Sequence, residues 1–298
     1  MTDTTLRTAV IIGCGATGTS VALALTAAGV DVALIDRDPR ATAEAAALGG
    51  GRPWSPARPP ADLVVVATPP SSVVDILHTA QARGMGHVYT DTAGTKDIVS
   101  ADAELRGCDL KGYVPGHPMA DSDAPGRNGA DAGRFDGRPW ILCPYESTPD
   151  WALDTVGALI ELCGAVRRDM APDAHDRAVA VVSHAPYLSQ AAVAAEFADA
   201  GADLSALVGP ELLTGIRAAG ADPATGSDLL THNAGPVADA LDRIADRIAA
   251  VARILHEGAE TAPVELAALL ELGARGHRAV AGVPGHSTTE DAPRPDPA

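Results

Sequence analysis

The sequence predicts an α/β N-terminal domain with a doubly wound, mostly parallel sheet, followed by an all-α domain. Three observations predict this fold. A glycine-rich turn joins a short apolar run to a helical segment near the N-terminus, strand and helix patterns alternate up to residue 148, and Ala-, Leu- and Val-rich segments with helical spacing follow. We therefore place the α/β domain at 1–148, the helical domain at 149–281, and a disordered tail rich in Pro, Thr, Asp and Glu at 282–298.

The elements of the α/β domain follow from local patterns. Short apolar or β-branched runs predict strands at 8–12, 31–35, 62–67, 87–90, 112–114 and 140–143. Helical spacing predicts helices at 19–28, 41–48 and 71–83. The run 63–66 is wholly apolar, as expected of a parallel strand that is covered on both faces.

From residue 151 to 272 the apolar residues recur at helical spacing, with almost no strand pattern. Apolar stripes fall within 156–163, 178–188 and 241–255. Together these stripes exceed what one small bundle buries, so we expect the helical domain to form a homodimer interface.

Composition excludes several classes of protein. A formal net charge of −17 disfavours binding to nucleic acid. The four cysteines form no CxxC pair, and no His cluster has zinc-ligand spacing, so we expect free thiols and no metal site. The N-terminus lacks the basic region of a signal peptide, and no uninterrupted apolar run reaches the ~18 residues that span a bilayer. We expect a cytoplasmic protein that does not contact membranes.

The glycine-rich turn has the pattern of a dinucleotide-binding site, the mark of a Rossmann domain. The first glycine permits a tight turn, the second lets the backbone approach a pyrophosphate, and the third allows close packing of helix and strand. A free helix N-terminus then faces the anion. Cofactor contacts are expected from Gly13, Gly15, Ala16, Thr17 and Gly18.

Asp36 ends the second predicted strand, where a carboxylate accepts hydrogen bonds from ribose hydroxyls and repels a 2′-phosphate. This favours NAD over NADP, although the adjacent guanidinium of Arg37 could hold a 2′-phosphate. Thr68 and Pro69 follow the buried strand and Asp91 follows the next one, so we expect all three beside the cofactor at the carboxyl edge of the sheet.

Three segments carry polar residues that a core does not need: 91–96, 116–120, and 175–177 with 183–187. His175 and His184 are nine residues apart, hence about 180° apart on an ideal helix, so they serve one point only if a helix break changes the geometry. His175 and Asp176 are interpreted as a structural pair within the helical domain. Lys96 either balances substrate or cofactor charge, or caps a helix or pairs with a surface acid.

With the glycine turn, these segments resemble the prephenate/arogenate dehydrogenase family. Residues 116–120, GHPMA, match its GHPMAG element, and 91–96 resemble its DxxSVK element. His175-Asp176 with 183–186 resembles its HD…SHLP helix. Residues 217–223 resemble its TRIAxxDP segment, with Asn233 placed like a downstream Asn. The resemblance covers residues 10–255 in order.

The resemblance implies a nicotinamide that accepts hydride from C4 of a small-molecule cyclohexadienol while the ring carboxylate leaves as CO₂. It also implies that His117 is the catalytic residue that takes the hydroxyl proton and that Arg217 pairs with a substrate carboxylate. A loop histidine at 117 and a surface charge at 217 are the alternatives. His184 either lines the pocket or is structural.

The sequence departs from the family in the expected pocket. Gly94 stands where the family usually has Ser, and Asp121 replaces the Gly after GHPMA. Asp123 stands where many members have Glu, and Gly226 where many members have Trp. Tyr187 occupies the position of a second His, which some arogenate-type members also lack. We therefore expect these residues to contact the substrate, and the substrate to be prephenate, arogenate or 4-amino-4-deoxyprephenate. The other classes are a β-hydroxyacid dehydrogenase or imine reductase, disfavoured because no GxxxNxxK-like segment occurs, and a non-catalytic dinucleotide-binding regulator.

Overall fold

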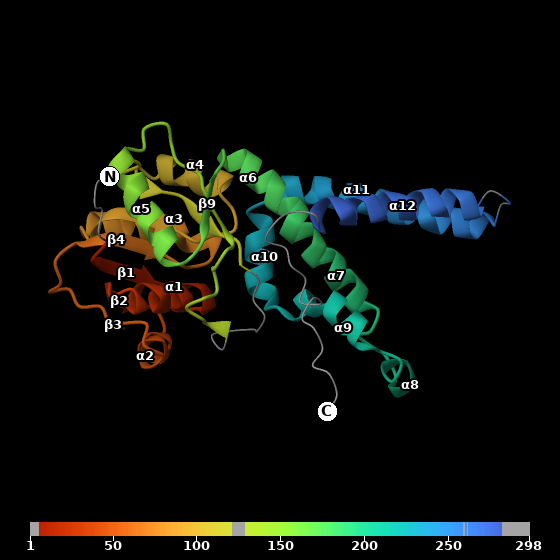
Figure 1. The fold of residues 1–298 in the computed structure, drawn as a ribbon, viewed down its shortest axis with the longest axis horizontal. Helices are drawn as coiled ribbons and strands as arrows, with labels where there is room; N and C mark the ends of the chain where they lie inside the picture. Colours follow the sequence, from red (N-terminus) through yellow and green to blue (C-terminus); the bar gives the residue numbers. More distant parts are fainter. Residues whose placement is uncertain (1–5, 121–128, 259, 261, 282–298) are drawn as a thin grey trace, which may run out of the picture. The chain divides into compact units, whose positions relative to one another are not determined.

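The computed structural model describes residues 6–120, 129–258, 260 and 262–281 (Figure 1). By their contacts the residues fall into two compact units, which divide between Val237 and Ala238. The first contains the α/β part and the helices that follow it up to the start of α11.

A six-stranded, all-parallel sheet forms the centre of the first unit, with the strand order β3-β2-β1-β4-β5-β6. The sheet places the ends of β1, β4 and β5 next to one another, which is where the predicted site residues begin. The strands are β1 (Thr8–Ile12), β2 (Asp31–Ile35), β3 (Arg52–Pro53), β4 (Ala61–Val66), β5 (Gly86–Asp91) and β6 (Tyr113–Val114).

Side chains alternate between the two faces of the sheet. On β1, Ala9 and Ile11 join the apolar cluster that contains α1 (Ala16–Ala27), α2 (Pro39–Ala47) and α5 (Asp150–Leu162). Val10 and Ile12 join the opposite cluster, which contains α3 (Pro70–Ala82) and α4 (Asp97–Leu105). Helices therefore cover both faces, and the predicted doubly wound Rossmann fold is confirmed.

A second, three-stranded sheet has the order β7-β8-β9, with β7 (Gly116–Pro118) antiparallel to β8 (Pro139–Leu142) and β8 parallel to β9 (Val166–Asp169). Strands β3, β7 and β9 and helix α4 are not among the predicted elements. The three strands are two to four residues long and include Pro or exposed Arg, so they lack an apolar pattern.

The α/β part extends past the predicted boundary at 148/149. Ala152, Val156, Leu159 and Ile160 of α5 are buried in the same cluster as β1, and β9 completes the second sheet. The apolar stripe predicted at 156–163 therefore packs against the sheet. Helical structure without strands begins only after β9.

The helices of the first unit after β9 start with a continuous run. It consists of α6 (Pro172–Val179), a π-helical turn (Ala180–His184) and α7 (Ala185–Ala195). Then follow α8 (Ala202–Ser205), α9 (Pro210–Gly215), a 3₁₀ turn (Arg217–Gly220) and α10 (Pro223–Thr231). Helix α11 (Ala234–Glu257) begins in the first unit, and the second contains the rest of it and α12 (Ala262–Ala281), which buries none of its side chains.

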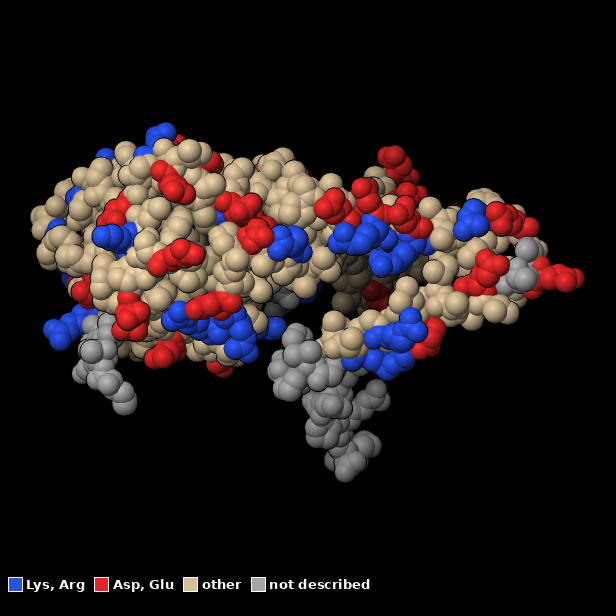
Figure 2. Space-filling model, turned by 90° about the horizontal axis from the view of Figure 1, so that it is seen from above, with Lys and Arg blue, Asp and Glu red and all other residues tan. Residues whose placement is uncertain are grey.

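By length and composition alone, the run 172–195 could cross a membrane, with a mean hydropathy of 1.2 over its most apolar window. Core helices of non-membrane proteins pass the same test, and the first turns of this run hold buried polar residues of the site below. Valines 181, 182 and 193 are exposed on it. On the face drawn in Figure 2, acidic and basic side chains are interspersed.

Candidate active site

The glycine-rich turn between β1 and α1 has the backbone of a phosphate-binding loop. Gly13 has a φ of +104°, and a Cβ there would lie 2.2 Å from the carbonyl oxygen of Ala67. A Cβ on Gly18 would lie 1.9 Å from the carbonyl oxygen of Gly13. Gly15 is exposed, and a Cβ there would have no neighbour within 4 Å. The turn is thus closed against β4, while the first turn of α1, with Ala16 and Thr17, faces open space that suits a pyrophosphate.

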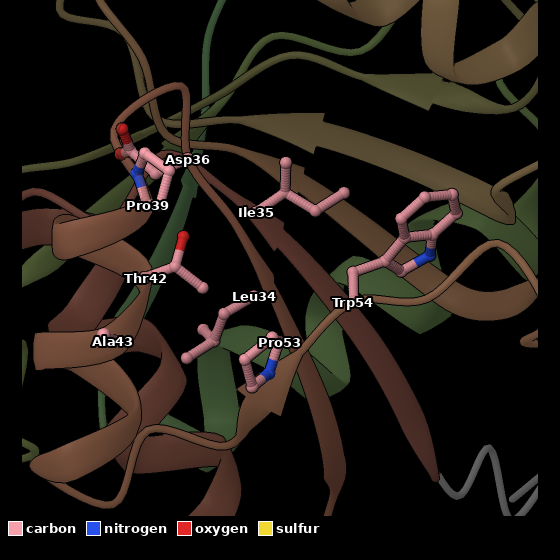
Figure 3. A pocket seen from close by; sticks show the side chains of 8 residues that line it. All are labelled: Leu34, Ile35, Asp36, Pro39, Thr42, Ala43, Pro53 and Trp54. Atoms are coloured by element: carbon pink, nitrogen blue, oxygen red, sulfur yellow. The ribbon is translucent and has the colours of Figure 1, made fainter.

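Asp36 follows β2 and contacts the glycine turn. Its carboxylate accepts hydrogen bonds from the N–H groups of Cys14, at 2.7 Å, and Asp38, at 2.9 Å. It also lines a pocket of about 330 Å³ that is otherwise mostly apolar (Figure 3). The other lining residues are Leu34, Ile35, Pro39, Thr42, Ala43, Pro53 and Trp54. An apolar pocket beside a carboxylate fits an adenosine, with the base between Ile35, Pro53 and Trp54 and the ribose at Asp36.

The other predicted cofactor residues lie around this turn. The Cγ2 atom of Thr68 lies 3.0 Å from the position of a Cβ on Gly13, so the end of β4 adjoins the turn as expected. The Oγ1 atom of Thr68 is buried without a hydrogen-bond partner among the described residues, which makes it a candidate cofactor contact. Pro69 precedes α3 and, like Arg37, is exposed.

Asp91, at the end of β5, lies in a buried ionic cluster. Lys96 Nζ donates to its Oδ1 at 2.5 Å, and the Tyr113 hydroxyl donates to its Oδ2 at 2.7 Å. The N–H groups of Ala93 and Gly116 donate to the same carboxylate. Asp91 and Lys96 have no exposed surface, so Lys96 pairs with a buried acid and not with the surface acid that was one of the expectations. The cluster ties β5 to the starts of α4 and β7.

His117 lies on β7, opposite Ile141 of β8, and at the edge of the buried region. Its Nδ1 lies 2.9 Å from Nε2 of His175 on α6, with the two rings nearly perpendicular. His175 Nδ1 in turn lies 2.7 Å from Oδ1 of Asp176. His175 and Asp176 thus form the expected pair on α6, and His175 also contacts the predicted catalytic histidine on β7.

Asp176 is held by the N-terminus of α4. Its Oδ1 accepts from the N–H of Lys96 at 2.8 Å, and its Oδ2 accepts from the N–H of Asp97 at 3.0 Å. Both His175 and Asp176 are buried. The chain Asp176–His175–His117 thus connects α4, α6 and β7. Sequence motifs mark all three residues, but only this fold brings them together.

His184 joins the same site because the helix changes its winding. The π-helical turn Ala180–His184 adds a residue per turn, so the 180° separation expected on an ideal helix does not hold. Asn233 Nδ2 lies 2.8 Å from the carbonyl oxygen of Asp176 and 3.1 Å from Nδ1 of His184. His184 is therefore buried on the same side as Asp176.

Two histidines of this cluster, His117 and His184, have lowered pKa values. Burial, then the nearby His175, Lys96 and His184, hold the pKa of His117 well below its ordinary value. Burial also lowers the pKa of His184 to about 4, with Asp176 acting in the opposite direction. Both imidazoles are therefore neutral at pH 7. Nε2 of His117 has no hydrogen-bond partner among the described residues, so it is the ring nitrogen that can accept a proton.

Gly94 lies directly beside that nitrogen. A Cβ on Gly94 would be 3.6 Å from Nε2 of His117 and 2.7 Å from Cδ1 of Leu229 on α10. The space that a larger side chain would need is thus taken by Leu229.

Tyr187 and Gly226, predicted at the substrate's periphery, contact each other. A Cβ on Gly226 would lie 2.7 Å from the Tyr187 hydroxyl. Arg217 is exposed at the start of the 3₁₀ turn, which packs against α7, and the N–H of the next residue, Ala218, donates to Gln190 of that helix. Asp121 and Asp123 lie outside the described residues. Among the residues that the structure does describe, no group of three or more His, Cys, Asp or Glu side chains could hold a metal ion.

Comparison with family models divides the chain at the end of β9. Residues 21–168 match the prephenate dehydrogenase nucleotide-binding domain, and residues 171–271 match the prephenate dehydrogenase dimerization domain. A probable prephenate dehydrogenase, NovF, from Streptomyces niveus is 36% identical over 252 residues, which are 84% of this chain and 69% of that protein.

Solved structures of similar fold have the same two parts. Prephenate dehydrogenase from A. aeolicus, in complex with hydroxyphenyl propionate and NAD⁺, superposes with a TM-score of 0.79 at 23% identity, over 92% of this chain and 99% of that one. A putative prephenate dehydrogenase from Corynebacterium glutamicum superposes with a TM-score of 0.80 at 25% identity, over 95% and 90% of the chains.

Proposed function

Because the chain belongs to the prephenate dehydrogenase family of oxidoreductases, we propose that it catalyses the NAD-dependent oxidative decarboxylation of a prephenate-like cyclohexadienyl acid. The observation that carries this proposal is the placement of His117. Its Nδ1 is engaged by His175, and its Nε2 lies beside the small residue Gly94. A neutral imidazole so placed suits the removal of a proton from a substrate hydroxyl.

The residues around the glycine turn fit a dinucleotide. The open space above Gly15 suits the pyrophosphate, and Asp36 beside the apolar pocket suits an adenosine without a 2′-phosphate. The A. aeolicus structure of the same fold is a complex with NAD⁺. When bound, the nicotinamide would supply the hydride acceptor.

The protein's own groups account for the rest of the chemistry. As hydride leaves C4, the hydroxyl proton moves to Nε2 of His117, and the C4 oxygen becomes a carbonyl. The electron pair of the bond to the leaving carboxylate then enters the ring, and the oxygen of the new aromatic ring recovers the proton from His117. His117 thus takes up one proton and returns it, and CO₂ is the only fragment released.

The guanidinium of Arg217 is the proposed partner of a carboxylate of the substrate. Arg217 is exposed on a turn that packs against α7, the helix that carries Tyr187. A guanidinium binds a carboxylate through two parallel hydrogen bonds, which fixes the orientation of the ring.

We also propose that the enzyme is a cytoplasmic homodimer. Valines 181, 182 and 193 are exposed on α7 and the π-helical turn, and the region 171–271 matches a dimerization domain. A second copy would cover such an apolar face. The four cysteines are free and buried, as in a reducing compartment. Sedimentation analysis should give twice the mass of the 298-residue chain.

The test of the reaction is an assay of nicotinamide reduction with prephenate, arogenate and 4-amino-4-deoxyprephenate, each with NAD and NADP. We expect turnover of at least one of these acids with NAD, and a loss in His117→Ala of about 10²-fold or more in kcat. His87→Ala, an exposed histidine on β5, is the control and should keep its activity. NAD binding without turnover of any of the three acids would support the non-catalytic regulator instead.

A further inference from the structure

We propose that His175 and Asp176 are positioning residues that fix the tautomer of His117, so that its Nε2 always presents a lone pair. The role of that lone pair in the reaction rests on the proposed function. The tautomer itself is a property of the free protein and can be measured without substrate.

The assignment starts at Asp176. Its two oxygens already accept hydrogen bonds from the N–H groups of Lys96 and Asp97, which are fixed backbone donors at the start of α4. A carboxylate in these contacts offers only lone pairs. His175 Nδ1, 2.7 Å from Oδ1, must therefore carry the proton in this contact.

The proton on Nδ1 of His175 determines the next contact. A neutral imidazole carries one proton, so Nε2 of His175 is an acceptor. His117 Nδ1 lies 2.9 Å from it and must therefore donate. The remaining nitrogen of His117, Nε2, then has no proton and faces the space beside Gly94.

The surrounding charges favour this neutral arrangement. Burial disfavours a second proton on His117, and it lowers the pKa of that residue. Asp176 can still stabilise a positive charge that forms on His117 during a reaction, through His175. Among the described residues, the titratable groups that act on the His117 ring are His175, Lys96 and His184. Asp91 pairs with Lys96, and Asp176 pairs with His175.

The first test reads the tautomer directly. Nitrogen-15 NMR of protein labelled at histidine distinguishes a protonated Nδ1 from a protonated Nε2, and His117→Gln and His175→Gln identify the two resonance pairs. We expect both His117 and His175 to carry the proton on Nδ1. A proton on Nε2 of His117 would overturn the proposal whatever the enzyme's substrate proves to be.

The second test reverses the direction of the hydrogen bonds that link residue 176, His175 and His117. In Asp176→Asn a single amide oxygen replaces two acceptor oxygens, and nitrogen-15 NMR of the variant shows which place it takes. In the Oδ1 place it keeps the Lys96 N–H and His175, and the tautomers stay as in the wild type. In the Oδ2 place it keeps the N–H of Asp97, and the NH₂ group donates toward His175. His175 then accepts at Nδ1 and donates at Nε2, and His117 is left with its proton on Nε2. With that tautomer we expect kcat to fall about 10²- to 10⁴-fold, with KM and the Kd of NAD changed less than about threefold. Asp173→Asn, on the exposed side of the same helix, is the matched control.

Two substitutions of His175 test the proposal independently, and they suffice if Asp176→Asn does not fold. Gln can donate to Asp176 and accept from His117, whereas Leu, of similar size, can do neither. His175→Gln should keep kcat within about tenfold of the wild type, and His175→Leu should lose about 10²-fold or more. Equal losses in both variants would contradict the proposal. If the wild type turns over none of the three acids but shows the expected tautomer, the proposed function fails and this inference stands.

Discussion

The hydroxyl oxygen of Tyr187 lies 2.7 Å from the point at which a side chain on Gly226 would begin. The two residues lie on α7 and α10, and both differ from what the family has at these positions. The contact shows that the two departures depend on each other, because a Trp at 226 would need the space that the Tyr187 ring occupies.

Gly226→Ala should therefore disturb the pocket through Tyr187. The hydroxyl is the end of a flexible side chain and can move, so we expect a moderate effect of about 1 kcal/mol on stability and a several-fold rise in KM. Tyr187→Phe removes the closest atom. In the double variant it should therefore restore most of the lost stability and most of the change in KM. A double variant whose losses are the sum of the single losses would show that the residues act independently.

Gly94→Ser should lower activity even though it restores the residue that the family has. The new Cβ would lie 2.7 Å from Cδ1 of Leu229, so the residue or α10 must shift at a cost of about 1–3 kcal/mol. Leu229→Ala opens the space, and we expect the double variant to regain stability in thermal unfolding. If its kcat with prephenate also exceeds that of the wild type, Leu229 restricts the turnover of prephenate.

Local sequence patterns predicted the cofactor half of this protein well. The glycine turn and Asp36 are encoded within one β-α-β unit, and the structure places them together as expected. The catalytic candidate His117 was found through its motif. Strands such as β7 and β9 were missed because three or four residues that include Pro, or exposed Arg, carry no periodic signal.

The row of side-chain contacts from His117 through His175 to Asp176 was missed for a different reason. His117 and His175 are 58 residues apart, and their contact depends on how β7 and α6 meet. The π-helical turn shifts the phase of the helix, so spacing alone misplaces His184 relative to His175. The contacts of Gly94 with Leu229 and of Gly226 with Tyr187 likewise join distant segments. Motifs therefore identified most of the residues but not which of them touch.

Asp36→Ser should weaken NAD binding and reduce discrimination against NADP. The substitution removes the carboxylate that would accept from the ribose hydroxyls and also the bond to the Cys14 N–H of the glycine turn. We expect the Kd of NAD, measured by calorimetry, to rise about tenfold and that of NADP to fall. Asp75→Asn, an exposed acid on α3, is the control. An unchanged ratio of the two affinities would mean that the pocket at Trp54 does not hold the adenosine.

Stability should fall in acid because of the buried histidines. The ordinary histidine pKa is 6.5, whereas that of folded His184 is about 4 and that of His117 is also lowered. As pH falls from 6.5 towards 4, the unfolded chain therefore binds protons that the folded chain does not, and the free energy of unfolding decreases. Urea unfolding across this window should show a shallower decrease for His184→Gln than for the wild type, because that variant loses the titrating group but keeps a side chain that can bond Asn233. The exposed His87→Gln should follow the wild-type curve. Parallel curves for all three proteins would show that another group dominates the acid sensitivity.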